Sequence, residues 1–532
     1  MSRAYASAPA ALLLALLVGT TPVEAQTQPH SRDQCTIPQF LSLVSALSAD
    51  SMDGREAGTA GGARAAALIQ RELERSGIAA PQSGWLQQVP LRLNRTTTAD
   101  VVVLAGAELP LDKNDGVIVQ SEDTATRAIG RGELVFVGFG ISAPDIGRDD
   151  FAGMSLEGRV AIIRTGAPDS SQLQLPWGRN DVRASDSYKL AIARSKGALG
   201  VIFLNARRSP PSSNGVKLLH GPAPLKIVAW LDDTATARLA ALLRLDLTDP
   251  TPAFPLPTTG GATPRQPEIR FEIQQEVGRA TSPNVIGVAR GRDPQAGAVV
   301  FTAHYDHLGA TASGSANHTV YHGALDNASG VAALICLARR FASESDSLRR
   351  SIIFVATTAE ETQGHLGAAW YASHPVVPLN QTVAVINIDG VNTLAPTEDF
   401  FVLPGTFVDG GGVFEKAGVA VGMTPATASF ERGMDWSFDT EAFNRRGVPA
   451  VTVWQGLRAR GLTPQEFFRI SRDRNSAYHT PADTVSSSWN SDAIQQHLDL
   501  LHRVGLGLAN TTQPIVLKPN SPYSLWPVVP PR

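Results

Sequence analysis

The chain has 532 residues, of which 43% are hydrophobic and 18% charged, an ordinary composition for a folded soluble protein. Its 46 Lys and Arg against 49 Asp and Glu give a formal net charge of -3, which excludes a basic field for nucleic acid and a polybasic stripe for anionic lipid. Its two cysteines, Cys35 and Cys336, are too few for a disulfide scaffold, although a bridge between them is compatible with an oxidising compartment.

The N-terminus is typical of an export signal. Arg3 supplies positive charge, residues 10–18 are uninterruptedly apolar, and Val23-Glu24-Ala25 fits a small-x-small cleavage site. The apolar stretch is well short of the roughly 20 residues that a bilayer span needs. We therefore expect residues 1–25 to be a signal peptide that is removed. The mature protein is then exported, to the periplasm or the exterior, with no attachment to the membrane.

Residues 26–255 divide into two parts that differ in their pattern of apolar residues. Apolar residues recur at helical spacing within 38–78, around turn chemistry at 53–58, so residues 26–110 are expected to begin with helices. Residues 115–255 instead carry short β-like runs broken by Gly, Pro and Asp, with a helix near 188–196. The runs in this half of the chain are 101–104, 134–137, 160–163 and 201–204.

The C-terminal half alternates strands and helices. Prolines and a Gly pair mark residues 256–282 as a linker that returns the chain to the main domain, and the Pro-rich residues 513–532 are expected to form an extended tail. Between them, residues 283–512 predict an α/β fold with three layers, in which helices flank a mixed, mostly parallel sheet. Its expected strands are 284–288, 298–302, 352–356, 383–388 and 450–454, and its expected helices include 330–341 and 367–373.

Polar residues directly follow three of these strands. His304 and Asp306 come after 298–302, the pair Glu360-Glu361 after 352–356, and Asp389 after 383–388. Ligands collect at the carboxyl ends of strands in open α/β sheets, so position makes these residues candidates for a site. Asp306 is placed to accept the second N–H of a metal-bound His304. Each residue taken alone also fits a role without function, such as a hydrogen-bonded loop residue or part of a solvated acidic turn.

Two further clusters complete a set of metal-binding residue types. Asp326 opens the helix at 330–341, where it fits either a helix cap or a carboxylate that bridges two cations, and Tyr478-His479 lies in a loop far along the chain. Two His with several carboxylates suit zinc better than magnesium or calcium. Two distant cysteines exclude a Cys-rich zinc finger.

Five motifs carry a specific resemblance. Residues 283–512 resemble the co-catalytic di-zinc aminopeptidase family, whose relatives include glutamate carboxypeptidase and the transferrin receptor. Residues 54–59 resemble the opening of that family. Residues 115–255 more weakly resemble a β-rich protease-associated (PA) domain inserted into such peptidases. The five motifs, which occur in the family's order, are Ala303–Gly309, Gly323–Gly330, Ala356–Glu361, Asn387–Gly390 and Tyr478–Thr484.

The resemblance implies a role for each matching residue. His304 and Asp389 would hold one zinc ion, Glu361 and His479 the other, and Asp326 would bridge the two. Glu360 would be the general base, Asp306 would orient His304, and Tyr478 would steady the oxyanion. The chain departs from many relatives at Phe438-Asp439-Thr440, where they carry Ser-Asp-His. This difference concerns the residues expected to line the substrate-binding site and not the metal ligands. His307, His322 and His365 match no ligand position and are expected to be hydrogen-bonded loop residues.

The resemblance therefore implies an exported metallo-aminopeptidase that uses two Zn²⁺ ions to hydrolyse N-terminal bonds of peptides. Three alternatives stay open at this point. A carboxypeptidase or dipeptidase of the same fold would differ in the residues that line its substrate-binding site. A non-catalytic, receptor-like binding protein would not need the complete set of ligands. A single-zinc cyclising acyltransferase would differ in its metal stoichiometry.

Overall fold

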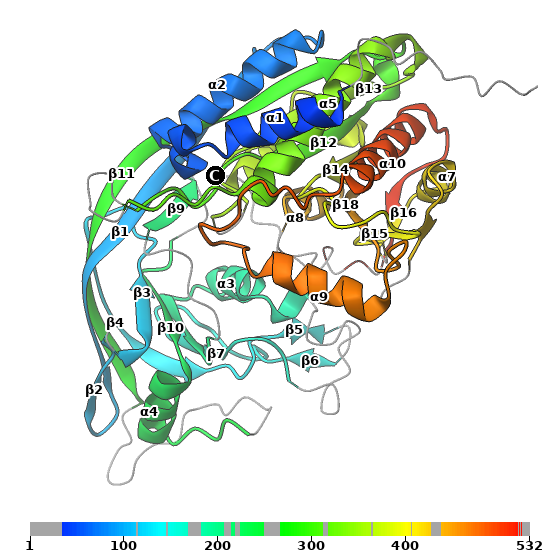
Figure 1. Cartoon of the computed structure of the whole chain (residues 1–532). Coiled ribbons are helices and arrows are strands. Elements are labelled where there is room, and N and C mark those ends of the chain that lie inside the picture. Colours follow the sequence, from blue (N-terminus) through cyan, green and yellow to red (C-terminus); the bar gives the residue numbers. More distant parts are fainter. Residues whose placement is uncertain are drawn as a thin grey trace, which may run out of the picture.

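A computed structural model describes most of the chain (Figure 1). The expected signal segment 1–25 lies outside the described residues, as do residues 256–265 of the expected linker and 524–532 of the expected tail. No helix in the described part is long and apolar enough to cross a bilayer. The described residues are 35–112, 115–144, 147–168, 182–206, 214–218, 224–248, 266–311, 318–362, 365–405, 407–426, 438–519, 521 and 523.

The C-terminal half is built on a mixed sheet that is parallel at its centre. Neighbouring strands β18, β14, β12 and β13 run parallel, whereas β11 and β15 pair antiparallel at either side of them. This arrangement confirms the predicted mixed, mostly parallel sheet. The strand order is β17 (Thr424–Pro425), β15 (Asp399–Leu403), β18 (Ala450–Gln455), β14 (Thr382–Asn387), β12 (Ala298–His304), β13 (Ser351–Thr357) and β11 (Glu268–Ala289).

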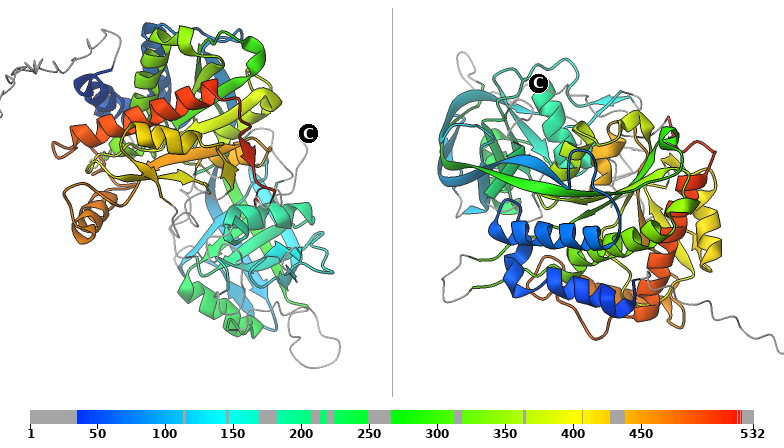
Figure 2. Two further views of the ribbon diagram at one scale, coloured as in Figure 1. Left: turned by 90° about the vertical axis from the view of Figure 1, so that its right-hand side faces the viewer. Right: turned by 90° about the horizontal axis from the view of Figure 1, so that it is seen from above.

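Helices cover both faces of this sheet, because successive residues of its apolar strands point to opposite sides. In β12, Val299 and Phe301 join one core and Val300 joins another. The first core includes α1 (Ile37–Leu47), α2 (Ala60–Arg75), α5 (Gly330–Ser343), α7 (Val413–Ala420) and α10 (Ser491–Asn510). The second includes α6 (Leu366–Ser373) and α8 (Thr440–Asn444). Figure 2 shows these layers from two further sides.

Two long strands carry a second lobe away from this sheet. β1 (Leu86–Leu104) pairs antiparallel with β11 along its length, from Leu86↔Val285 to Leu104↔Glu268. The first half of β4 continues the ribbon beside β11, and its second half begins a parallel sheet with β7 and β8. This lobe has two cores of its own. It contains β3 (Val117–Gln120), β4 (Arg127–Phe136), β7 (Val160–Arg164), β8 (Gly200–Leu204), β10 (Ile227–Leu231), α3 (Asp186–Ser195) and α4 (Asp233–Leu243).

Short strands and one further helix complete the fold. β2 (Glu108–Pro110) and β9 (Asn214–Leu218) pair with β1, and β5 (Ser142–Ala143) pairs with β6 (Arg148–Asp149). The helix α9 (Pro464–Asn475) was not expected from the sequence and precedes the His479 loop. Cys35 and Cys336 form a disulfide that ties the start of the described chain to α5.

Two expected irregular segments are partly strand. The segment expected to link and return the chain to the main domain, 256–282, is a strand from Glu268 onward, in which Ile269, Phe271 and Ile273 alternate with polar residues and point into the core of the second lobe. In the expected tail, β19 (Val516–Leu517) pairs with β16 (Val408–Asp409). In both cases nearby Pro and Gly residues led to the prediction of irregular structure, but pairing with a distant strand makes part of the segment a β-strand.

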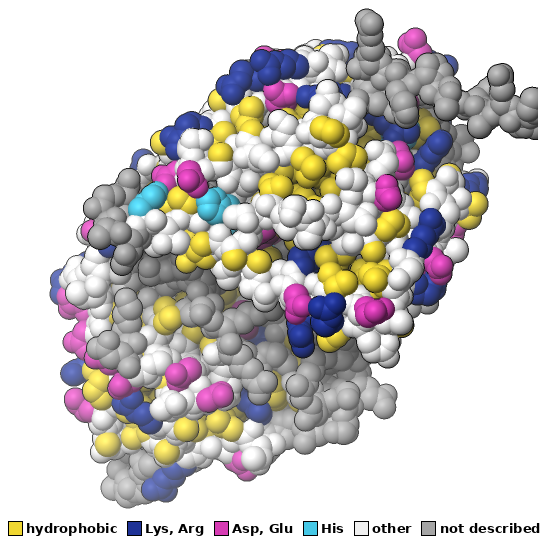
Figure 3. All heavy atoms as spheres, viewed as in Figure 1, with side chains coloured by type: hydrophobic (Ala, Val, Ile, Leu, Met, Phe, Trp, Pro, Cys, Tyr) yellow, Lys and Arg dark blue, Asp and Glu magenta, His cyan; other side chains and the backbone are white. Residues whose placement is uncertain are grey.

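Acidic and basic side chains are interspersed over the described part of the face in Figure 3. This mixture agrees with the formal net charge of -3 over the whole chain. Such a mixture gives the described part of that face no extended field of one sign.

Candidate metal centre and active site

Three parallel strands deliver the predicted residues to one edge of the sheet. β12 ends at His304, β13 at Thr357 and β14 at Asn387, so the polar residues that follow them meet at the carboxyl ends of neighbouring strands. β12 lies between the other two: its own connection leads to β13, and the connection from β13 returns past β12 to β14 on the other side. In open α/β sheets this switch point is where ligands bind.

The first ligand cluster surrounds His304. Its Nε2 atom lies 3.3 Å from Asp389 Oδ1 and 3.3 Å from Asp326 Oδ1. Glu360 Oε2 is farther from the same nitrogen, at 3.9 Å. His304 and Glu360 are buried and Asp389 is half-buried. The cluster thus brings together the two residues expected to hold one zinc ion, with the expected bridge and the expected base beside them.

The second ligand cluster surrounds His479. Its Nε2 atom lies 3.1 Å from Asp326 Oδ2 and 3.1 Å from Glu361 Oε2. The nitrogen is buried and makes no hydrogen bond within the described structure. Asp326 therefore presents one carboxylate oxygen to His304 and the other to His479. This is the geometry that a carboxylate bridging two cations requires.

The spacing of these atoms fits zinc. Nitrogen and oxygen ligands lie about 2.0–2.2 Å from the ion, and at tetrahedral angles two such ligands are roughly 3.3–3.5 Å apart. Of the four contacts made by the two imidazoles, those of His304 are 3.3 Å, at the lower end of this range, and those of His479 are 3.1 Å, slightly below it. His479 Nε2 also faces two carboxylate oxygens without hydrogen-bond geometry to either, as a metal ligand would. The donor set of imidazoles and carboxylates suits zinc as well.

Buried carboxylates outnumber the nearby cations at this centre. Burial raises the pKa of Glu360 to about 8 and also raises that of Asp389. Burial opposes protonation of His479, but its contacts with Asp326 and Glu361 outweigh burial and raise its pKa to about 10. Without bound metal, protons must therefore offset the repulsion between these groups, and divalent cations can take their place.

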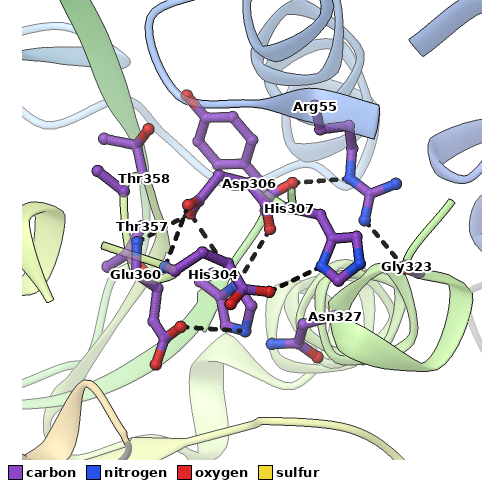
Figure 4. A network of polar contacts seen from close by, with 12 residues as sticks. Arg55, His304, Asp306, His307, Gly323, Asn327, Thr357, Thr358 and Glu360 are labelled. Carbon is purple, nitrogen blue, oxygen red and sulfur yellow. Dashed lines mark hydrogen bonds and ion pairs between the residues drawn. The ribbon is translucent and has the colours of Figure 1, made fainter. Parts of the chain in front are cut away.

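Asp306 reaches the site in a different way from the one expected. His304 Nδ1 is 3.2 Å from the main-chain carbonyl of Asp306, whereas the nearest carboxylate oxygen is 3.9 Å away. The carboxylate instead accepts the backbone N–H groups of Glu360, at 3.1 Å, and Glu361, at 3.3 Å. Asp306 thus orients His304 through its backbone and holds the Glu360-Glu361 turn through its side chain (Figure 4).

Asp483 supports the bridging carboxylate and was not singled out from the sequence. Its two oxygens accept the backbone N–H groups of Leu325, at 2.9 Å, and Asp326, at 3.0 Å. The residue is buried and belongs to the same loop as His479. It therefore joins the loop that carries one ligand to the turn that carries the bridge. Its place four residues after His479 was the only signal in the sequence.

Arg55 is a fully buried cation beneath the site and was expected only as part of a turn. Its guanidinium donates to the carbonyl oxygens of Tyr305, at 2.8 Å, Gly323, at 2.9 Å, and His322, at 2.7 Å, as well as Leu47, at 2.7 Å. Burial lowers its pKa to about 10, which leaves it charged at neutral pH. Figure 4 shows Arg55 beside the segment of Asp306 and His307. Arg55 thus fixes two site loops and adds positive charge under the carboxylates.

The three histidines expected to be hydrogen-bonded loop residues are hydrogen-bonded, and two of them contact site carboxylates. His307 Nδ1 lies 2.7 Å from Glu361 Oε1, and His365 Nδ1 lies 3.1 Å from Glu360 Oε1. His322 Nδ1 instead lies 3.0 Å from the carbonyl of Ser48. His307 belongs with Asp326, Glu361 and His479 to one group of four possible ligands. It leaves Oε2 of Glu361 to face His479.

Tyr478 lies at the mouth of the site. Its ring stacks on that of His479, with centroids 3.8 Å apart, and the residue is 60% exposed. A hollow of about 330 Å³ opens beside the same loop and is lined by Asp50, His318, Thr319, Val320, His322 and Pro481. In the region where the chain departs from its relatives, Phe438 is buried against Trp454 and Asp439 accepts a hydrogen bond from Thr357.

Comparisons with known proteins find similar folds. The structure of an aminopeptidase from Aneurinibacillus sp. strain AM-1 is similar, with a TM-score of 0.50 and 18% identity over 92% of this chain and 97% of that one. A zinc aminopeptidase from Bacillus subtilis gives a TM-score of 0.44 and 20% identity over 88% of this chain and 94% of that one. A peptidase M28 precursor from Shewanella amazonensis gives 0.44 and 19% over 91% and 95%. No curated protein matches the chain.

The family comparison covers the part of the chain that carries the ligand clusters. Residues 284–504 match the family described as Peptidase family M28. The matched range begins in β11 and ends in α10, so it includes both ligand clusters and the central sheet from the last part of β11 onward, whereas α1 and α2 lie outside it. Fold and sequence match thus agree: residues 284–504 resemble peptidase family M28, and the fold is similar to that of an aminopeptidase.

Proposed function

We propose that this protein is an exported aminopeptidase that hydrolyses the N-terminal bond of peptides with two zinc ions and Glu360 as the general base. The observation that carries the proposal is the placement of Asp326 between two imidazoles. His304, which also contacts Asp389, lies against one of the carboxylate oxygens of Asp326, and His479, which also contacts Glu361, lies against the other. Two equivalent half-sites that share one carboxylate suit a pair of ions better than a single one.

Zinc, when bound, lowers the pKa of a coordinated water and polarises the scissile carbonyl. The chain supplies the proton transfers. Glu360 is buried, lies 3.9 Å from His304 Nε2 and is not needed to complete either half-site, so its Oε2 is free to accept the proton of the attacking water. It can then deliver that proton to the leaving amine. The phenol of Tyr478, beside His479, is the candidate donor to the oxyanion.

Two features favour an N-terminal substrate outside the cytoplasm. The similar fold of an aminopeptidase from Aneurinibacillus sp. strain AM-1 supports an N-terminal substrate. The Cys35–Cys336 disulfide and the signal-like residues 1–25 both fit an oxidising, exported location. We further propose that residues 115–255 are a PA domain that screens substrates, since this lobe folds around its own cores on the β1–β11 ribbon.

The test compares two adjacent glutamates given the same isosteric change. We expect Glu360→Gln to keep two zinc ions per chain and to lose about 10²–10⁴-fold in kcat, the usual contribution of a general base. Glu361→Gln should lose zinc from one half-site. Zinc is counted by elemental analysis, and activity is measured on aminoacyl substrates with and without a chelator.

The substrate class is tested with matched peptides. Peptides with a free N-terminus should be cleaved, and the same peptides with an acetylated N-terminus should not. Near-normal kcat in Glu360→Gln would refute the assigned base. Cleavage from the C-terminus would favour the carboxypeptidase alternative, and zinc binding without hydrolysis of any peptide would favour a binding protein.

A further inference from the structure

His365 joins the proposed general base to a helix that carries no ligand. It lies just before α6, and its backbone adopts the left-handed conformation with φ 46°. Its Nδ1 atom is 3.1 Å from Glu360 Oε1, and its Nε2 atom is 3.5 Å from Glu441 Oε2. The residue is buried. A single imidazole therefore stands between two buried carboxylates from different elements.

Glu441, which contacts His365 on the side away from Glu360, is itself held by an ion pair. Glu441 is buried at the start of α8 and its other oxygen pairs with Arg445. Next to it, Asp439 accepts a hydrogen bond from Thr357, the last residue of β13. The loop that carries Glu360 is thus tied to the start of α8 at two points, one through the hydroxyl of Thr357 at the end of β13 and one through His365.

The charges make the contact a stable one. Burial alone would lower the pKa of His365, but its hydrogen bond to Glu360 and the charges of Glu360, Glu441 and Asp439 outweigh burial and raise the pKa to about 9. Both ring nitrogens can then donate. Without this donor, the buried Glu360 would lose the hydrogen bond on its Oε1 atom, whereas Glu441 would keep its ion pair with Arg445.

Without this contact, Glu360 could coordinate a metal ion instead of acting as a base. Its side chain, with His304 and Asp389, forms a group of three whose ligand atoms all lie within 4.8 Å of one another and could hold a metal ion. A carboxylate that coordinates the ion cannot also serve as a free base. Something must therefore hold Glu360 back from the ion, and the contact on its Oε1 atom is made by His365.

We infer that His365 is a positioning residue that keeps Glu360 a base rather than a ligand, by holding its Oε1 atom against the anchored Glu441. The inference rests on the proposed two-zinc aminopeptidase function. It gives the buried imidazole a role that is separate from binding either ion, and it makes α8 part of the support of the active site.

The test uses two substitutions that differ in one hydrogen bond. His365→Leu removes both donors, and His365→Asn keeps a donor near the position of Nδ1 and loses the contact with Glu441. We expect H365L to lower kcat by about 10–100-fold, as changes to groups that orient a metal site do, with KM within about twofold. H365N should recover most of that loss.

A second readout is independent of turnover. With cobalt in place of zinc, the visible absorption reports the coordination number, and we expect H365L to shift toward higher coordination as Glu360 joins the ion. H365N should keep the wild-type spectrum. A wild-type kcat and spectrum in H365L would overturn the inference, as would a loss that H365N does not restore.

Two controls keep the result interpretable. Should H365L fail to fold, Glu441→Gln weakens the anchor alone and is expected to lower kcat severalfold; wild-type kcat in E441Q would then overturn the inference. Glu360→Gln separates this inference from the proposed function. If E360Q keeps its kcat the function itself fails, whereas a loss in E360Q with none in H365L refutes only the role of His365.

Discussion

The second lobe and the catalytic half both bury charged side chains, but they balance them differently. In the lobe, Lys189 is fully buried and donates to the carbonyls of Arg164 and Gly166 at 2.7 Å each, and Asp150 pairs with Arg148 at 2.7 Å. Each of these charges has a permanent partner in the chain. In the catalytic half, carboxylates gather around two imidazoles with too few cations to pair them.

The difference shows which buried charges serve structure and which serve binding. A buried ion with partners in the chain needs no ligand, and its cost is met at folding. A buried group of like charges is stable only with protons or metal ions, so its state depends on pH and on metal supply. The contrast can be tested by removing one charge from each region and one from the surface.

The largest effect is expected from Asp326→Ala. Because this carboxylate completes both half-sites, its loss should release both zinc ions and lower activity to the level of a chelator-treated sample. Zinc per chain, measured by elemental analysis, checks the prediction. Asp50→Ala is the control, since this side chain is 88% exposed at the nearby hollow and should keep both ions. Two zinc ions retained in D326A would count against the bridge.

A medium effect that depends on pH is expected from Lys189→Met. Burial lowers the pKa of Lys189 from 10.5 to about 8, so between these values the unfolded chain binds more protons than the folded one. The free energy of unfolding contributed by this group therefore rises with pH across that window, by roughly 3 kcal/mol in total.

Urea unfolding at pH 7.5 and pH 10 checks this prediction. The wild type should gain stability relative to K189M as the pH rises, and zinc content should be equal in the two proteins because the lobe has its own core. A constant difference between the two proteins at both values would show that the charge of Lys189 does not matter to folding.

The smallest effect is expected from Glu276→Gln on the β1–β11 ribbon. Glu276 faces Arg95 across the ribbon and the pair is exposed, so water screens it. We expect no change in Tm or in activity. A drop in Tm beyond the scatter of replicate melts would indicate that this pair helps to hold the lobe on its ribbon.

The strands and their ends were determined by the sequence. Continuous apolar runs such as 298–302 and 352–356 can be buried on both faces only in the middle of a sheet covered by helices. The residues that follow such strands must then meet at one edge, and for that reason His304, Glu361 and Asp389 could be named in advance. By contrast, the long ribbon of β1 and β11 was not predicted. Both strands contain many polar residues, and they can be recognised as strands only once their pairing with each other is known.

Only the tertiary structure decided which atoms face one another. Arg55 meets the carbonyl of Tyr305 across 250 residues of sequence, and Asp483 meets Leu325 across 158. The division of labour between the backbone and the carboxylate of Asp306, and the contact of His365 with Glu360, likewise depend on ångström distances between separate segments. Local patterns determine which segments form and where each one ends, but hydrogen-bond partners are chosen by packing between segments that the sequence separates.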